Sequence, residues 1–175
     1  MRAPRTPNMD SPTEPKPAVY VETTIISYLA ARPSRDVIIL ANQELTRIWW
    51  ERETQRYRVL ISPRVIEEAR QGDPRFAARR LELLAELEAL ESDPAVETLA
   101  EEIRSALHIP EKAALDAYHL AFAVHYVVDY LVTWNCKHLA NARNLRLLAD
   151  YTVSRGLWLP IVCTPAEMVG EVAED

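Results

Sequence analysis

Short apolar runs recur along the chain between longer segments in which apolar and charged residues are mixed. The runs are rich in Val, Ile, Leu and Tyr, and each has the length of a buried strand rather than of a helix. We therefore predict strands at 18–22, 58–62, 129–133 and 157–163, with a minimal additional strand at 95–97.

The segments between these runs carry apolar residues three and four positions apart, which is the spacing of one helix face. Helices are predicted at 23–29, 36–56, 64–71, 74–91, 99–107, 111–124 and 144–155. Ser34 is the predicted cap of the second helix, Pro63 opens the third, and Gly72 ends it. Strands that alternate with helices predict an α/β fold, a three-layer domain on a central, mostly parallel sheet.

The first 17 residues lack this patterning and hold five prolines among small polar residues. We predict a disordered Pro-rich N-terminal tail at 1–17 and one domain at 18–175, which is long enough to bury its core without disulfides. Cys136 and Cys163 are then expected to be reduced thiols in a cytoplasmic protein. No apolar run approaches the roughly 20 residues of a membrane span, so we expect no membrane association.

Helix 111–124 is apolar nearly all round, yet it carries Asp116 in its middle. Such a helix is expected to be buried on most sides. A buried carboxylate costs free energy unless it is paired, hydrogen-bonded or bound to a cation. Pairing with Lys112, one helical turn earlier, is the simplest explanation, and a functional site is the alternative.

Other acidic and polar residues are expected beside Asp116. Glu22 ends the first predicted strand, Glu67 and Glu68 follow the second, and Asn135 follows the strand at 129–133. Ligands of parallel sheets bind beyond the carboxyl ends of the strands, so these side chains are predicted to converge. Oxygen-only ligands suit Mg or Mn, and such a site favours metal-dependent hydrolysis of a phosphodiester.

Several other chemistries lack the residues they need. With three glycines in the whole chain there is no Gly-rich phosphate loop and no G-x-S-x-G motif, and the four histidines lack zinc-site spacing. His119 is interpreted as pocket support, a structural hydrogen-bonding residue near Asp116. The net charge of −6 argues against nonspecific coating of nucleic acid, although local arginines could still serve a nuclease.

Four segments together resemble the PIN-domain ribonucleases, and within them the VapC-like toxins of type II toxin-antitoxin systems. They occur in the family's order at 19–26, 61–68, 116–121 and 131–138. The resemblance implies an α/β/α sandwich with a parallel sheet. It also implies a Mg- or Mn-dependent endoribonuclease that cleaves single-stranded RNA and leaves a 5′-phosphate and a 3′-hydroxyl.

The resemblance also assigns site residues. The four catalytic positions fall on Glu22, Glu68, Asp116 and Asn135, the first three as metal ligands, with Glu67 as the alternative register to Glu68. Most members have Asp where this chain has Glu22 and Asn135. The longer side chain displaces its oxygens, and the neutral amide is expected to weaken metal affinity.

Further expectations follow from the same resemblance. Thr23 and Thr133 match hydroxyl residues that flank the site. The residues expected to guide RNA are Arg32, Arg64, Arg70, Lys137 and His138. A cognate antitoxin protein and a homodimer are the implied partners. The alternative is a catalytically silent PIN-like module that binds RNA or a protein partner.

Overall fold

The computed structural model describes residues 15–170, so the predicted tail lies largely outside the described part of the chain. In chain order the elements are β1 (Ala18–Val21), α1 (Thr23–Ala30), α2 (Val37–Arg52), the 3-10 turn η1 (Thr54–Arg56), β2 (Arg58–Ile61), α3 (Pro63–Ala69), α4 (Pro74–Leu84), β3 (Glu88–Ala89), α5 (Pro94–Ala106), the 3-10 turn η2 (Glu111–Ala113), α6 (Ala114–His125), β4 (Tyr130–Val132), α7 (Ala142–Arg155), β5 (Ile161–Cys163) and α8 (Pro165–Met168).

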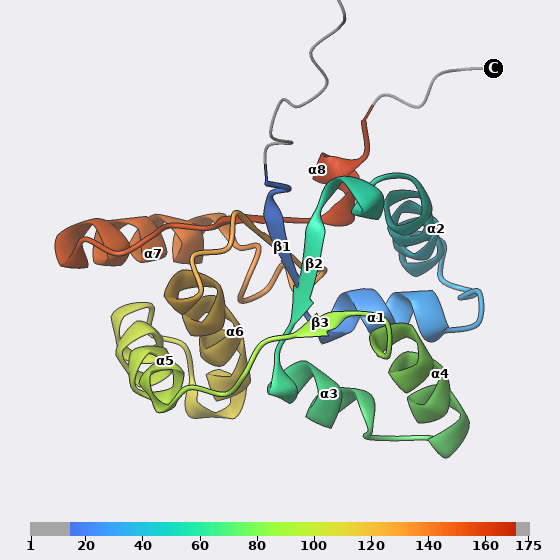
Figure 1. Ribbon diagram of the computed structural model, residues 1–175, viewed down its shortest axis with the longest axis horizontal. Helices are drawn as coiled ribbons and strands as arrows, with labels where there is room; N and C mark the ends of the chain where they lie inside the picture. The colour runs from blue at the N-terminus through green and yellow to red at the C-terminus, as the bar shows by residue number, and fades with distance from the viewer. Residues whose placement is uncertain (1–14, 171–175) are drawn as a thin grey trace, which may run out of the picture.

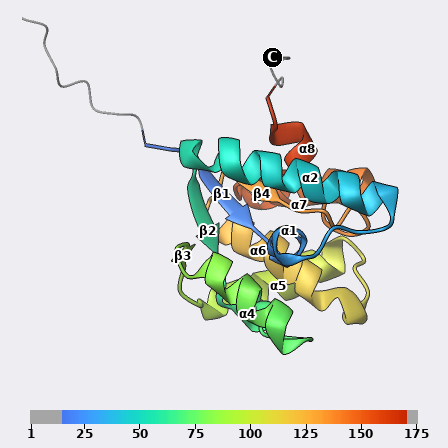
Figure 2. The ribbon, with the colours of Figure 1, turned by 90° about the vertical axis from the view of Figure 1, so that its right-hand side faces the viewer.

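The five strands form one sheet in the order β3-β2-β1-β4-β5, and every neighbouring pair is parallel. Helices α5, α6 and α7 lie on one side of the sheet, and α1, α2 and α4 lie on the other (Figure 1). The view turned by 90° shows α2, α1 and α4 in front of the strands (Figure 2). The predicted three-layer α/β/α architecture is confirmed, with a sheet that is wholly rather than mostly parallel.

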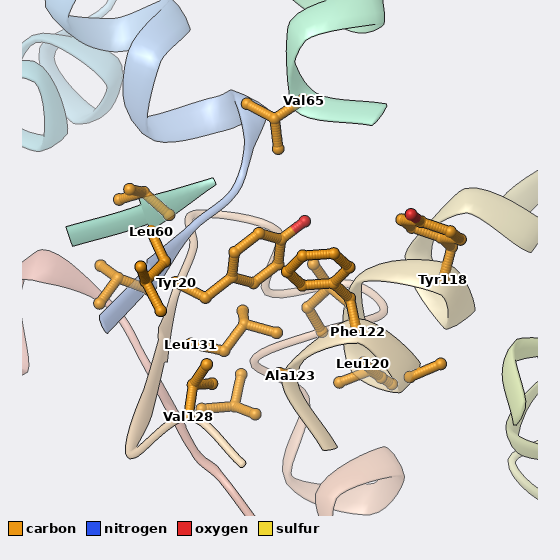
Figure 3. Packing of buried hydrophobic residues seen from close by; sticks show 14 of the residues in the cluster. Tyr20, Leu60, Val65, Tyr118, Leu120, Phe122, Ala123, Val128 and Leu131 are labelled. Carbon is orange, nitrogen blue, oxygen red and sulfur yellow. The ribbon is translucent and has the colours of Figure 1, made fainter. Parts of the chain in front are cut away.

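Helix α6 forms the centre of the core on its side of the sheet. Eight consecutive residues, from Ala117 to Val124, are buried, as expected for a helix that is apolar all round. The ring of Phe122 lies 4.8 Å from the ring of Tyr20 on β1, centroid to centroid. Figure 3 shows these two rings in contact, with Leu131 of β4 beside them. The helix that carries Asp116 is thus held directly against the central strand.

Between β2 and α6, one predicted helix is too long and one predicted strand is wrong. The predicted helix at 74–91 ends at Leu84, and the chain then forms β3, which pairs with Leu60 and Ile61 of β2. Arg58 donates to both carboxylate oxygens of Glu88 and so strengthens this edge pairing. The predicted strand at 95–97 is instead the first turn of α5, because Asp93 caps a helix that begins at Pro94.

Other boundaries differ by a few residues. Asp36, not Ser34, caps α2, since its carboxylate accepts hydrogen bonds from the amides of Ile38 and Ile39. That helix ends at Arg52, before the predicted limit of 56, and the last strand is confined to Ile161–Cys163. Within residues 15–170, no helix combines the length and the hydropathy needed to cross a membrane.

Candidate functional site

The carboxyl ends of three neighbouring strands place the candidate residues at one edge of the sheet. Glu22 follows β1, Ser62 follows β2 and Thr133 follows β4. All three are buried. Helices α1 and α3 begin at this edge (Figure 1). Thr23 in the first turn of α1 and Glu68 in the last turn of α3 add side chains that hydrogen-bond to each other. The geometry is the one expected of a ligand site on a parallel sheet.

Glu22 is held at this edge by hydrogen bonds to two threonines. Its carboxylate caps α1 by accepting from the amide (3.0 Å) and the hydroxyl of Thr24, and it also accepts from Thr133 Oγ1 at 2.8 Å. The residue is only 4% exposed. Burial raises the pKa of this carboxyl, although the positive potential of His119 and the three hydrogen bonds oppose the shift.

A consequence for stability can be tested with Glu22→Gln in EDTA. The carboxyl of Glu22 binds its proton more tightly in the folded protein than in the unfolded chain. Glu22 therefore lowers the stability of the fold as pH rises above the ordinary glutamate pKa. Gln keeps the shape of the Glu side chain and one acceptor oxygen. The hydroxyls of Thr24 and Thr133 can each accept a hydrogen bond from the side-chain amide of Gln. We expect a gain of about 0.5 to 2 kcal/mol in the free energy of unfolding at pH 7.

The control for this prediction is the same measurement at low pH. Urea unfolding at pH 4, where the wild-type carboxyl is protonated, should show little or no gain for Glu22→Gln. A loss of stability at pH 7 would mean that the charge itself stabilises the fold.

The acids after β2 differ sharply in their surroundings. Glu68 accepts from Thr23 Oγ1 at 2.5 Å and lies 3.2 Å from His119 Nε2. Glu67 is turned away and pairs with Arg64 at 3.0 Å. Burial alone would raise the pKa of Glu68. The charge of His119 and the hydrogen bonds from His119 and Thr23 outweigh burial and hold this pKa below its usual value. Glu68 therefore faces the site as an anion.

His119 connects Glu68 to two buried hydroxyls that the sequence analysis did not identify. Its Nδ1 lies 2.6 Å from the hydroxyl of Tyr20, which lies 2.8 Å from Ser62 Oγ. A carboxylate only accepts, so His119 Nε2 carries the hydrogen bonded to Glu68. The Nδ1 of His119 and the hydroxyls of Tyr20 and Ser62 thus form one chain of hydrogen bonds, in which either hydroxyl can donate to the other. This chain fixes the imidazole and aims it at Glu68, which agrees with a role in pocket support.

Asp116 is linked to Glu22 through Asn135 and Thr133. The amide of Asn135 donates to Asp116 Oδ1 at 2.9 Å, and its carbonyl accepts from the backbone of His138 at 3.0 Å. The backbone of Asn135 donates to Thr133 Oγ1 at 2.8 Å. Burial raises the pKa of Asp116; His138 and His119 oppose the shift, whereas the nearby charge of Glu68 adds to it.

These residues can be tested for their fit to a divalent cation. Glu68 and Asp116 are half-buried carboxylates close enough to repel each other, and carboxylate oxygens are ligands that suit Mg or Mn. Both oxygens of Glu22 are already hydrogen-bonded. Among residues 15–170, no group of three His, Cys, Asp or Glu side chains lies close enough together to hold a metal ion without rearrangement. The carboxylates fit such an ion: Glu68 and Asp116 would be its principal ligands, whereas the oxygens of Glu22 are engaged by hydrogen bonds.

The residues expected to guide RNA differ in their contacts and in how near they lie to this edge. Arg64 is engaged by Glu67 and Glu97 and lies over the ring of Tyr118. Arg70 and Lys137 are exposed, and no ion pair joins either of them to another described residue. The imidazole of His138 is close enough to influence Asp116. Arg32 lies beyond the far end of α1, over the ring of Phe76.

Comparison with known proteins places the fold. The parallel five-stranded sheet flanked by helices is a PIN-like α/β fold. The crystal structure of Mycobacterium tuberculosis VapC20, a toxin that cleaves the sarcin-ricin loop, matches with a TM-score of 0.52 and 16% sequence identity. The match covers 65% of this chain and 87% of that one. No family model and no curated protein matches the sequence. The resemblance to PIN domains predicted from the sequence is thus confirmed for the fold.

Proposed function

We propose that this chain is a Mg- or Mn-dependent endoribonuclease that cleaves single-stranded RNA and acts as the toxin of a toxin-antitoxin pair. The observation that carries the proposal is the placement of Glu68 and Asp116, two half-buried carboxylates at the carboxyl edge of a PIN-like sheet. The similarity in fold to an RNA-cleaving VapC toxin supports the same activity.

In this proposal Glu68 and Asp116 are metal ligands, and Glu22 contributes as the third acid. The bound ion supplies positive charge that stabilises the phosphodiester during attack by water. Water adds to phosphorus and the 3′-oxygen leaves, which yields a 5′-phosphate and a 3′-hydroxyl. Asn135 holds Asp116, and the pair of His119 and Thr23 holds Glu68, so that both carboxylates stay oriented for the ion.

The partners follow from the same proposal. RNA is the substrate, a cognate antitoxin inhibits by covering the acidic edge, and the chain forms a homodimer in the cytoplasm. A catalytically silent PIN-like module that binds RNA or a protein partner is the second candidate. It is favoured by the neutral Asn135 and by the hydrogen bonds that occupy Glu22.

Removing the metal separates the two candidates. The purified protein is incubated with a mixed pool of single-stranded RNA in Mn²⁺, in Mg²⁺ and in EDTA. An endoribonuclease should give products with 5′-phosphates in metal, no products in EDTA, and recovery when Mn²⁺ is added back. RNA that is bound but intact under all three conditions would favour the silent module.

A further inference from the structure

A positively charged cavity lies outside the acidic edge, between the end of α1 and the start of α4. Its volume is about 360 Å³, and it is lined by Arg32, Asp73, Arg75, Phe76 and Arg79. The three arginines are exposed. The single acid of the lining, Asp73, caps α4 by accepting from the backbone of Arg75 at 2.8 Å. The cavity therefore presents three guanidinium groups beside one carboxylate.

Within the described residues no ion pair neutralises the charge of these arginines, although Arg32 lies over the ring of Phe76. Elsewhere in residues 15–170, arginines form ion pairs with Glu or Asp at Arg47, Arg56, Arg58, Arg64, Arg104, Arg146 and Arg155. No such pair joins Arg32, Arg75 or Arg79 to a described residue. In a chain of net charge −6, a cluster of this kind is suited to an anionic partner.

Arg80 fixes the cavity relative to the acidic edge. Its Nε donates to the carbonyl of Ala69 at 3.0 Å, and its Nη2 donates to that of Gln71, so α4 is tied to the end of α3. Ala69 directly follows Glu68. Thr23, which contacts Glu68, opens α1, and Arg32 follows that helix. Eight helical residues span about 12 Å, which is the scale of the separation between acidic edge and cavity.

We propose that this cavity binds backbone phosphates of the single-stranded RNA that enters the acidic edge. The inference deepens the proposed function and rests on it for the class of substrate. A guanidinium group can donate two parallel hydrogen bonds to phosphate oxygens, so three exposed arginines around one cavity can hold backbone phosphates. The acidic edge repels RNA, so a cation cluster about 12 Å away supplies the attraction that binding requires.

The test is binding of a fluorescein-labelled 12-nucleotide RNA in EDTA, where metal-dependent cleavage is off. Arg75→Gln/Arg79→Gln is compared with Arg52→Gln/Arg143→Gln, which removes the same charge from exposed arginines on α2 and α7. The cavity variant should bind about 10-fold more weakly at 0.1 M salt, with a salt slope smaller by about 0.7 to 1.4, and the control variant should match wild type.

The outcomes separate this inference from the proposed function. Equal affinity and slope for both variants would overturn the cavity as an RNA site, even if the wild-type protein cleaves RNA. Selective loss in the cavity variant would support it, even if no cleavage is found. A polyglutamate peptide that binds more tightly than the RNA, and loses binding in the cavity variant, would assign the cavity to an acidic protein and overturn the inference.

Discussion

Asp116→Asn is expected to lower RNA cleavage about 100-fold or more while leaving the fold at least as stable as before. The loss of activity follows because a metal ligand contributes several kcal/mol to the transition state, and each 1.36 kcal/mol is tenfold in rate. Stability should hold because burial raises the pKa of Asp116, so its charge is a cost to folding. Asn keeps the oxygen that accepts from Asn135.

Glu67→Gln provides the matched control. Glu67 is exposed, and its partner is Arg64, so its loss should leave cleavage at the wild-type rate and change stability by less than about 0.5 kcal/mol. Glu68→Gln should behave like Asp116→Asn in cleavage. Initial rates at saturating Mn²⁺, with urea unfolding of the same samples, measure both quantities. Cleavage by Asp116→Asn at the wild-type rate would remove this residue from the site.

Phe122→Ala is expected to cost about 3 to 5 kcal/mol of the free energy of unfolding, the largest effect on stability among these substitutions. Phe122 is fully buried on α6, next to Tyr20 of β1 (Figure 3). The centroid of its ring lies 4.8 Å from that of Tyr20 and 4.6 Å from that of Tyr126. The cavity left by Ala would also loosen Tyr20, whose hydroxyl positions His119.

Phe122→Leu serves as the control, because it retains most of the buried volume and should cost only about 1 kcal/mol. Urea unfolding by circular dichroism measures both variants. A loss below 1 kcal/mol for Phe122→Ala would mean that α6 does not depend on this contact with β1.

The fold could be predicted where local pattern and tertiary structure agree. Strands β1, β2 and β4 are short apolar runs, and α6 is apolar all round, so each was identified from the sequence. The boundary between α4 and β3 could not be found locally. Leu83, Leu84, Leu87 and Leu90 continue one helical stripe, all packed against the core. Pairing with the distant β2 decides that this segment leaves the helix.

The candidate site, like the fold, could be predicted from the sequence only in part. The rule for parallel sheets, with the packing of a buried helix on the sheet, was enough to expect Glu22, Asp116 and either Glu67 or Glu68 at one edge. The choice of Glu68 came from the resemblance to PIN domains. The roles of Tyr20 and Ser62 could not be predicted, because a Tyr inside a strand has the pattern of a core residue. Its hydroxyl partner, His119, is 99 positions away in the chain. Hydrogen bonds over such separations become visible only once the fold is known.

A Mn²⁺-soaked crystal of the protein with an RNA fragment, examined by anomalous scattering, tests the central claim most directly. The account predicts a Mn²⁺ peak at the carboxyl edge of the sheet, within about 2.5 Å of carboxylate oxygens of both Glu68 and Asp116. Manganese bound only elsewhere, with this edge empty at saturating concentration, would contradict the account.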